Sequence, residues 1–177
     1  LLDAAYLDER ARLLGERSMG LAQPGVPRAA SITLGEAAET ERAGTSHVSI
    51  VDRRGNAVAM TTTIEDAFGS RIMVRGFLLN NQLTDFSFVP ERGGRPVANR
   101  VEPGKRPRSS MAPAFVLDAK GNLRLVAGSP GGLAIVNFVA KTLVATLDWK
   151  LDAQAAVSLP NFGSRNGPTE IERGTLY

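Results

Sequence analysis

The sequence predicts an α+β fold built on antiparallel strands. Residues 45–63 and 114–127 each alternate apolar and polar side chains around a turn that contains glycine and asparagine, which is the pattern of a β-hairpin. Residues 133–149 instead repeat apolar side chains at helical spacing. Because the hairpins come first and the helices follow to pack on them, the predicted sheet is antiparallel.

The N-terminal part is predicted to be a helix followed by an irregular connector. Residues 1–14 place leucine and tyrosine side chains at helical spacing between charged ones. Residues 15–42 carry Pro24, Pro27, several glycines and a charged run, which is typical of an exposed, irregular segment. At Gly44 the pattern changes to strand alternation.

Strand and helix signals then follow in order. The predicted strands are residues 45–51, 57–63, 77–79, 114–117 and 123–127. Residues 92–107 are rich in glycine, proline and arginine and are predicted to be a loop. The helix over 133–149 carries two adjacent apolar stripes, a width that indicates burial against a sheet. Asp152 is the predicted N-cap of a last helix over 153–157.

The composition excludes several kinds of chemistry. The chain of 177 residues has no cysteine, so disulfides, thiolate metal sites and cysteine nucleophiles are excluded. His47 is the only histidine, which excludes a multi-histidine metal site, and we expect neither a metal nor a cofactor. The net charge is only +3, and the arginines are scattered along the chain and not clustered. Both observations give little support for nucleic-acid binding. No segment has the length and apolarity of a membrane span.

The junction of connector and strand has a specific chemical meaning. If the Gly44–Thr45 peptide bond is cut, Thr45 becomes an N-terminal residue whose α-amine has an ordinary pKa of about 7.7–8.0. Such an amine can accept the proton of the hydroxyl on the same residue, so one threonine supplies nucleophile and base. The same residues also fit a plain strand start, because threonine favours β-structure.

A glycine-rich turn precedes the long helix. Gly131 and Gly132 would expose backbone N–H groups at the positive end of the helix dipole. That arrangement suits an oxyanion or a carboxylate. A tight turn that needs glycine for its backbone angles explains the residues equally well.

Two polar loops could bind a ligand. Ser109 and Ser110 lie between prolines and could present hydroxyl groups to a carboxylate. Gln82 and Asp85 follow an apolar strand and could hold an ammonium group. Ordinary solvated turns account for both segments as well, because these residue types favour turns.

The order of these motifs resembles the γ-glutamyltranspeptidase family, a branch of the N-terminal-nucleophile hydrolases. The resemblance covers residue 45 to about residue 172. The matching segments are TSHVSIVD at 45–52, GNAVA at 55–59, TTT at 61–63, FGS at 68–70, LLNNQ at 78–82, DFS at 85–87, PGKRP at 103–107, SSMAP at 109–113, GSPGG at 128–132 and LPNF at 159–162.

The resemblance implies a catalytic set. In the family, the precursor cuts itself before the threonine matched by Thr45, here after Gly44, and that threonine then attacks a γ-glutamyl amide. Water or an acceptor amine resolves the acyl-enzyme. Thr63 matches the threonine whose hydroxyl supports the nucleophile, and Gly131 and Gly132 match the glycines of the oxyanion hole.

The resemblance also implies a substrate-binding set. Ser109 and Ser110 match serines that hold the glutamyl α-carboxylate. Gln82 and Asp85 match groups around the α-amino group, with Asp85 supplying the countercharge. Glu65 stands where many members have asparagine, a difference that can shift substrate preference. His47 lies beside the nucleophile and is interpreted as structural, because the mechanism does not require it.

The implied fold is the αββα sandwich of N-terminal-nucleophile hydrolases, of which this chain would be a part. Residues 1–44 would be the end of the large subunit with its exposed connector, and residues 45–177 the catalytic portion of the small subunit. The expected partners are a γ-glutamyl substrate and the rest of the large subunit, in a heterodimer of processed subunits whose further assembly is open. The resemblance favours a periplasmic or secreted location, with a cytoplasmic one left open.

Three functions remain open at this point. The first is an autoprocessing γ-glutamyltranspeptidase or glutathione hydrolase. The second is a related amide acylase of the cephalosporin-acylase kind, for which Glu65 leaves room because it alters the acyl pocket. The third is a catalytically silent fragment, because an intact Gly44–Thr45 bond would block the amine that Thr45 needs as its base.

Overall fold

The computed structural model describes residues 2–27, 34–35 and 44–175. Its elements are α1 (Ala4–Ala11), β1 (Thr45–Val51), β2 (Ala57–Thr63), β3 (Met73–Val74), β4 (Phe77–Leu78), the 3-10 helix η1 (Gln82–Asp85), β5 (Glu91–Arg92), β6 (Arg95–Pro96), β7 (Ala114–Leu117), β8 (Leu123–Ala127), the 3-10 helix η2 (Gly132–Ala134), α2 (Ile135–Leu147), α3 (Ala153–Ser158), β9 (Phe162–Gly163) and β10 (Glu170–Ile171). The α+β class is confirmed, and within the described residues each strand pairs with its neighbour in sequence to form an antiparallel hairpin.

The β1–β2 hairpin carries the predicted nucleophile at its open end. Its register pairs Thr45 with Thr63 and continues to Val51 opposite Ala57. The turn is closed by the Asp52 carboxylate, which accepts hydrogen bonds from the backbone N–H groups of Arg54 and Asn56 at 2.7 and 2.9 Å. Local sequence therefore sets both the register and the turn of this hairpin.

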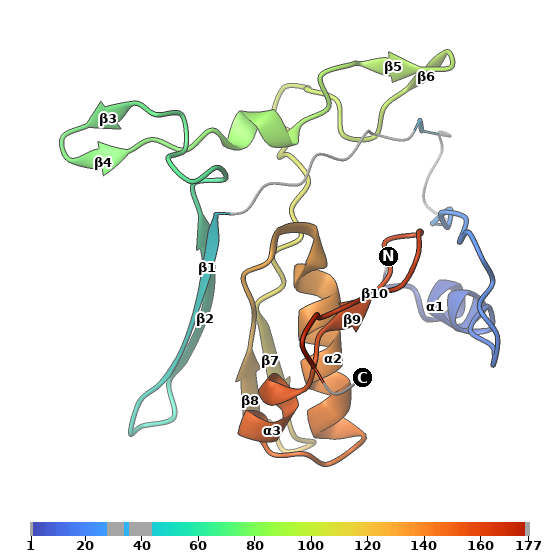
Figure 1. Cartoon of the computed structure of the whole chain (residues 1–177), viewed down its shortest axis with the longest axis vertical. Coiled ribbons are helices and arrows are strands. Elements are labelled where there is room, and N and C mark those ends of the chain that lie inside the picture. Colours follow the sequence, from blue (N-terminus) through green and yellow to red (C-terminus); the bar gives the residue numbers. More distant parts are fainter. Residues whose placement is uncertain (1, 28–33, 36–43, 176–177) are drawn as a thin grey trace.

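The main packed unit is formed by β7, β8, α2 and α3. Figure 1 shows α2 beside the β7–β8 hairpin in the centre of the molecule, with α3 near its lower end. The buried apolar side chains of this unit are Ala127, Ile135, Val139, Ala145 and Ala156. Asp152 caps α3 by accepting a hydrogen bond from the Ala155 N–H at 2.8 Å, as the sequence predicts.

A second arm crosses the upper part of Figure 1 and contains β3–β4, η1 and β5–β6. Phe86 and Val97 are buried in it. Backbone hydrogen bonds from Ser87 N–H to Asn99 C=O and from Val97 N–H to Pro90 C=O tie its loops together at 2.8 Å each. The arm is continuous with the open end of β1–β2, so its loops lie near Thr45 and Thr63.

Several boundaries differ from the sequence predictions. Helix α1 covers only Ala4–Ala11, with Asp3 as its N-cap, and Leu2 and Leu14, near the ends of the predicted helix, are exposed. The helix predicted over 133–149 begins at Ile135, after a 3-10 turn. The loop predicted over 92–107 takes part in the β5–β6 hairpin. Residues 28–33 and 36–43 of the predicted connector lie outside the described residues.

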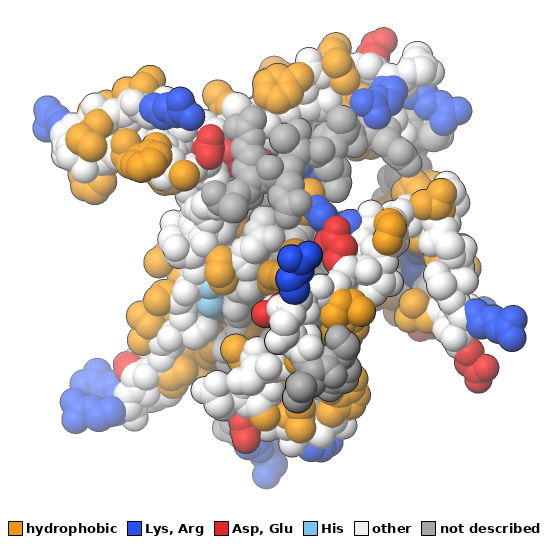
Figure 2. Space-filling model, in the orientation of Figure 1, with side chains coloured by type: hydrophobic (Ala, Val, Ile, Leu, Met, Phe, Trp, Pro, Cys, Tyr) orange, Lys and Arg blue, Asp and Glu red, His pale blue; other side chains and the backbone are white. Residues whose placement is uncertain are grey.

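The surface leaves much apolar area exposed. Figure 2 shows hydrophobic side chains along the β1–β2 hairpin, at the left of the view, with basic side chains near its tip. Val48, Ile50, Val58 and Met60 of this hairpin are all exposed. Among the described helices, none has the length and apolarity needed to cross a membrane.

Candidate active site

One cavity of about 60 Å³ gathers most of the predicted site residues. Five separate stretches of sequence contribute to its wall, which consists of Thr45, Thr63, Glu65, Gln82, Asp85, Arg108, Ser109, Ser110, Met111, Gly132, Leu133 and Ile135. Gly44 and Gly131 adjoin lining residues in sequence but do not line the cavity themselves. The open end of the β1–β2 hairpin, the upper arm and the N-terminus of the α2 region therefore meet at one point.

Thr45 and Thr63 face each other as a cross-strand pair. The Thr63 hydroxyl donates a hydrogen bond to the carbonyl oxygen of Gly44 at 3.1 Å and accepts one from the backbone N–H of Glu65 at 2.8 Å. The carbonyl of Gly44 belongs to the peptide bond that the sequence predicts to be cut. The second threonine thus contacts the predicted cleavage point directly.

Gly44 lies against the backbone of the next loop. A Cβ atom at this position would overlap the carbonyl oxygen of Glu65, which is a backbone atom and cannot swing aside. The close approach brings the chain before β1 alongside the loop after β2. A residue with a side chain would push these two segments apart.

Glu65 is held in an unusual backbone conformation at the wall of the cavity. Its φ is 75°, in the region that residues with a Cβ rarely adopt, and its exposed fraction is 8%. Its carboxylate accepts a hydrogen bond from the side-chain amide of Asn81 at 2.9 Å, and the side-chain oxygen Oδ1 of Asn81 accepts one from the Asp66 N–H at 3.1 Å. Such an arrangement, with strain at a ligand-facing position, is common at functional sites.

The loop with Gln82 and Asp85 forms the short helix η1 beside Glu65. The Gln82 side-chain amide donates a hydrogen bond to the Asp85 carboxylate. Asn99 donates to the Asp85 backbone carbonyl at 2.5 Å and accepts from the Arg108 N–H at 3.0 Å. Asn99 therefore connects the predicted ammonium-binding loop to the predicted carboxylate-binding loop.

The serine loop also reaches the cavity. The Ser109 hydroxyl accepts a hydrogen bond from the Met111 N–H at 3.2 Å, and Ser110 is half-buried. Arg108, which precedes the serines, is a cavity residue that the sequence analysis did not single out. The cavity is thus lined by two carboxylates, Glu65 and Asp85, and one guanidinium, a set that complements a ligand carrying both charges.

The glycine turn before α2 has the backbone geometry that glycine allows. Gly131 and Gly132 have φ values of 133° and 55°, both in the range where a side chain brings strain. The Gly131 carbonyl accepts from the Ala134 N–H at 3.0 Å. The N–H groups at the start of the helical segment therefore need partners outside the helix, which makes this end suited to an anion.

Three polar residues of this site were not predicted from the sequence. Asn81 and Asn99 hold the loops in place, and Arg108 lines the cavity. Asn81 belongs to one of the matching motifs, but only the tertiary contact reveals its bond to Glu65. In the part of the chain that the structure describes, no group of three or more histidine, aspartate or glutamate side chains is arranged to hold a metal ion.

Comparison with known proteins finds consistent matches. The family model described as gamma-glutamyltranspeptidase matches residues 1–175. The glutathione hydrolase proenzyme of Pseudomonas sp. (strain A14) is 36% identical over 188 residues, which cover 99% of this chain and 31% of that protein. The corresponding proenzyme of Escherichia coli (strain K12) is 41% identical over 151 residues, covering 79% of this chain and 26% of that protein. The chain thus spans about a third or less of the relatives it matches.

Solved structures agree with the sequence matches. A mutant of the Helicobacter pylori gamma-glutamyltranspeptidase superposes with a TM-score of 0.64 at 39% identity, covering 72% of this chain and 73% of that one. The Bacillus anthracis transpeptidase enzyme CapD gives a TM-score of 0.55 at 29% identity, covering 73% of this chain and 67% of that one. These matches confirm the fold class that the sequence predicts.

Proposed function

This chain belongs to the γ-glutamyltranspeptidase family, and we propose that the protein is an autoprocessing γ-glutamyltranspeptidase or glutathione hydrolase. The observation that carries the proposal is the single cavity that joins Thr45 to the predicted groups for an ammonium, a carboxylate and an oxyanion. Local motifs from distant parts of the chain converge there, as one reaction centre requires.

The proposed first step is cleavage between Gly44 and Thr45. With these residues joined, the nitrogen of Thr45 is an amide and cannot accept a proton, and the Thr63 hydroxyl is bonded to the Gly44 carbonyl. Hydrolysis of the bond adds one water molecule, which turns the Thr45 nitrogen into an amine and leaves Gly44 with a carboxylate, so this carbonyl no longer belongs to the chain that starts at Thr45. The Thr63 hydroxyl is then free to bond the nucleophile opposite it in the register.

The proposed chemistry then runs through an ester on Thr45. The hydroxyl oxygen of Thr45 attacks the γ-carbonyl carbon while its proton passes to the Thr45 α-amine. The N–H groups of Gly131 and Gly132 stabilise the negative oxygen that forms. The tetrahedral intermediate breaks its C–N bond, the leaving amine takes the proton, and water or an acceptor amine later attacks the ester to release the γ-glutamyl group.

The cavity charges favour an α-amino acid head group. Glu65 and Asp85 would hold the ammonium, with Gln82 orienting Asp85. Ser109 and Ser110 would donate hydroxyl hydrogen bonds to the carboxylate. A glutaryl or adipyl chain, as an acylase of the related kind would bind, lacks the ammonium and would place no positive charge against the two carboxylates.

The test uses the full-length protein and two substrates. Intact mass should show two pieces that separate between Gly44 and Thr45, and a γ-glutamyl anilide should turn over much faster than a glutaryl anilide. A single uncleaved, inactive species would support the silent alternative, and preference for glutaryl anilide would support the acylase.

The nucleophile is tested by substitution. Thr45→Ala should lower turnover by a factor of about 10³ or more, because the covalent route is lost. Thr62→Ala is the matched control, since Thr62 is exposed on the neighbouring strand and does not line the cavity. A Thr45→Ala protein that turned over γ-glutamyl anilide normally would rule the mechanism out.

A further inference from the structure

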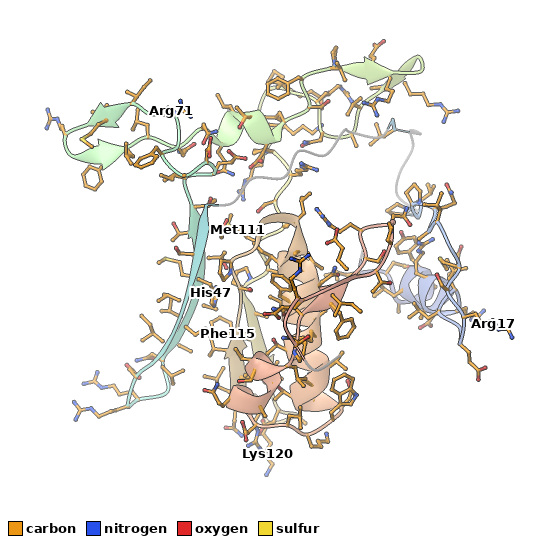
Figure 3. The ribbon with its side chains drawn as sticks, in the orientation of Figure 1. Arg17, His47, Arg71, Met111, Phe115 and Lys120 are labelled. Carbon is orange, nitrogen blue, oxygen red and sulfur yellow. The ribbon has the colours of Figure 1, made fainter. Side chains whose placement is uncertain are left out.

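We propose that His47 is a positioning residue that sets the distance between the nucleophile strand and the glycine turn. It lies two residues after Thr45 on β1, and it faces the strand β8 that leads into Gly131 and Gly132. Figure 3 shows His47 on the hairpin, on the side of the β7–β8 unit. The inference rests on the proposed function and assigns His47 a role that the chemistry itself does not demand.

Hydrogen bonds fix the imidazole at both of its nitrogens. Nδ1 lies 2.8 Å from the Thr61 hydroxyl on β2, and Nε2 lies 3.0 Å from the Ser49 hydroxyl on β1. Both partners belong to the β1–β2 hairpin. The ring is therefore held as a rigid part of the hairpin, in an orientation that its two partners determine.

The ring meets Gly128 at the end of β8. A Cβ atom added to Gly128 would overlap three atoms of the imidazole. Because the ring is held at both nitrogens, it cannot yield as a flexible side chain would. The imidazole and Gly128 therefore form a close steric contact, which limits how near the β1–β2 hairpin can come to the segment after β8. Both β1 and β2 also contact β8.

The two residues of this steric contact are close in sequence to the proposed nucleophile and the proposed oxyanion donors. Thr45 precedes His47 by two residues, and Gly131 follows Gly128 by three. Because these stretches are short, a change in the distance between the imidazole and Gly128 also changes the distance between the Thr45 hydroxyl and the oxyanion donors. Misplacement of reacting groups by about 1 Å can cost up to about 10² in rate.

The experiment is a double-mutant cycle in the full-length protein with His47→Ala, Gly128→Ala and the double variant. We expect each single change to lower kcat about tenfold or more, with KM within about twofold, because most of the binding groups, on η1 and the serine loop, lie on other segments. In the double variant the space left by the ring accepts the added methyl group. Its kcat should therefore exceed that of Gly128→Ala alone.

Two further variants separate positioning from general stability. His47→Gln keeps a planar polar side chain that can bond Thr61, and should recover part of the lost kcat. Val48→Ala removes an exposed apolar side chain from the neighbouring position of the same strand, and should leave kcat within about twofold. Additive losses in the cycle, or a fall in kcat/KM that resides in KM, would overturn the positioning role.

The same proteins distinguish this inference from the proposed function. If the wild-type protein shows no γ-glutamyl turnover, the proposed function fails. The melting temperatures of the four proteins of the cycle still test the contact, because the overlap between ring and methyl group requires them to be non-additive. Additive changes in melting temperature would show that His47 and Gly128 do not form the steric contact.

Discussion

The β1–β2 and β7–β8 hairpins have the same type of turn but differ in what packs against them. Both turns read Asp-x-x-Gly-Asn, and in both the aspartate accepts backbone hydrogen bonds two and four residues ahead, Asp52 at 2.7 and 2.9 Å and Asp118 at 2.9 Å each. The β7–β8 hairpin contributes the buried Ala127 and contacts α2 through β8, whereas the β1–β2 hairpin contacts β8 but leaves its large apolar side chains exposed (Figures 1 and 2). Local sequence can thus form a hairpin twice, while only tertiary contacts decide whether it belongs to a core.

The largest expected effect contrasts Ile135 of α2, the helix that β8 contacts, with Ile50 of the β1–β2 hairpin. Ile135→Ala should lower the free energy of unfolding by about 3 kcal/mol, because it leaves a cavity in the core, where Ile135 is 1% exposed. Ile50→Ala should cost less than about 1 kcal/mol, since Ile50 is 54% exposed. Denaturant unfolding of the two variants measures the difference. Equal losses would show that other parts of the full-length protein cover the β1–β2 hairpin.

A second prediction concerns the residue before β1. Gly44→Ala should slow cleavage at the Gly44–Thr45 bond about tenfold or more, because the new Cβ displaces the scissile carbonyl from its place beside Glu65 and Thr63. The ratio of precursor to products over time, read by intact mass, measures the rate. Gly15→Ala is the control, because nothing lies within 4 Å of a Cβ there. Unchanged cleavage in Gly44→Ala would show that the close approach is not needed.

A third prediction concerns the carboxylate of Glu65, which lines the cavity just after the end of β2. The corresponding strand of the other hairpin, β8, is followed by a glycine and not by a charged residue. Glu65→Gln should raise KM for a γ-glutamyl substrate about five- to tenfold, which corresponds to about 1–1.4 kcal/mol, and leave kcat within about twofold, because the ammonium loses one countercharge. Asp66→Asn is the matched control, since Asp66 is the next residue and does not line the cavity. A change in kcat alone would contradict a binding role for Glu65.

The smallest expected effect separates the two turns. The Asn56 side chain bonded to Asp52, and the Asn122 side chain bonded to Asp118, hold the pKa of each carboxyl below its ordinary value of 3.8. A lowered pKa in the folded state means that each carboxylate stabilises the fold above about pH 3.8, and that this stabilisation is lost as the pH falls through the lowered pKa.

Asp52→Asn and Asp118→Asn remove these charges one at a time. Asp52→Asn should raise amide hydrogen exchange in β1–β2 several-fold, because this hairpin depends on its turn, while Asp118→Asn should change exchange in β7–β8 by about twofold or less. The difference should fade below pH 3.8. Equal responses in the two hairpins would show that packing on α2 adds nothing to the stability of β7–β8.

Local patterns predicted much of the fold. Alternation of side chains and the Asp-x-x-Gly-Asn turns located both long hairpins, and the apolar stripes located α2. The short strands β3, β5, β6, β9 and β10 were not predicted, because two residues are too few to show an alternation. Helix α1 was predicted too long, since periodicity alone does not reveal that Leu2 and Leu14 are exposed.

The candidate site divides in the same way. The motifs around Thr45, Asp85, Ser109 and Gly132 identified groups that could act on a γ-glutamyl amide, and the structure brings all four to one cavity. The bond between Asn81 and Glu65 and the two bonds of Asn99 could not be predicted, because they join residues of different loops whose separation depends on the whole fold.

The sequence by itself determined the residue types, the positions of the two long hairpins and the family, because these depend on neighbouring residues and on the order of motifs. The tertiary structure decided which of these features meet. The sequence predicts only a structural role for His47, whereas in the folded chain its imidazole lies against Gly128, and only folding brings the two together. Distances between segments arise from packing, which no local pattern records, so the fold decides the spacing between the proposed nucleophile and the proposed oxyanion donors.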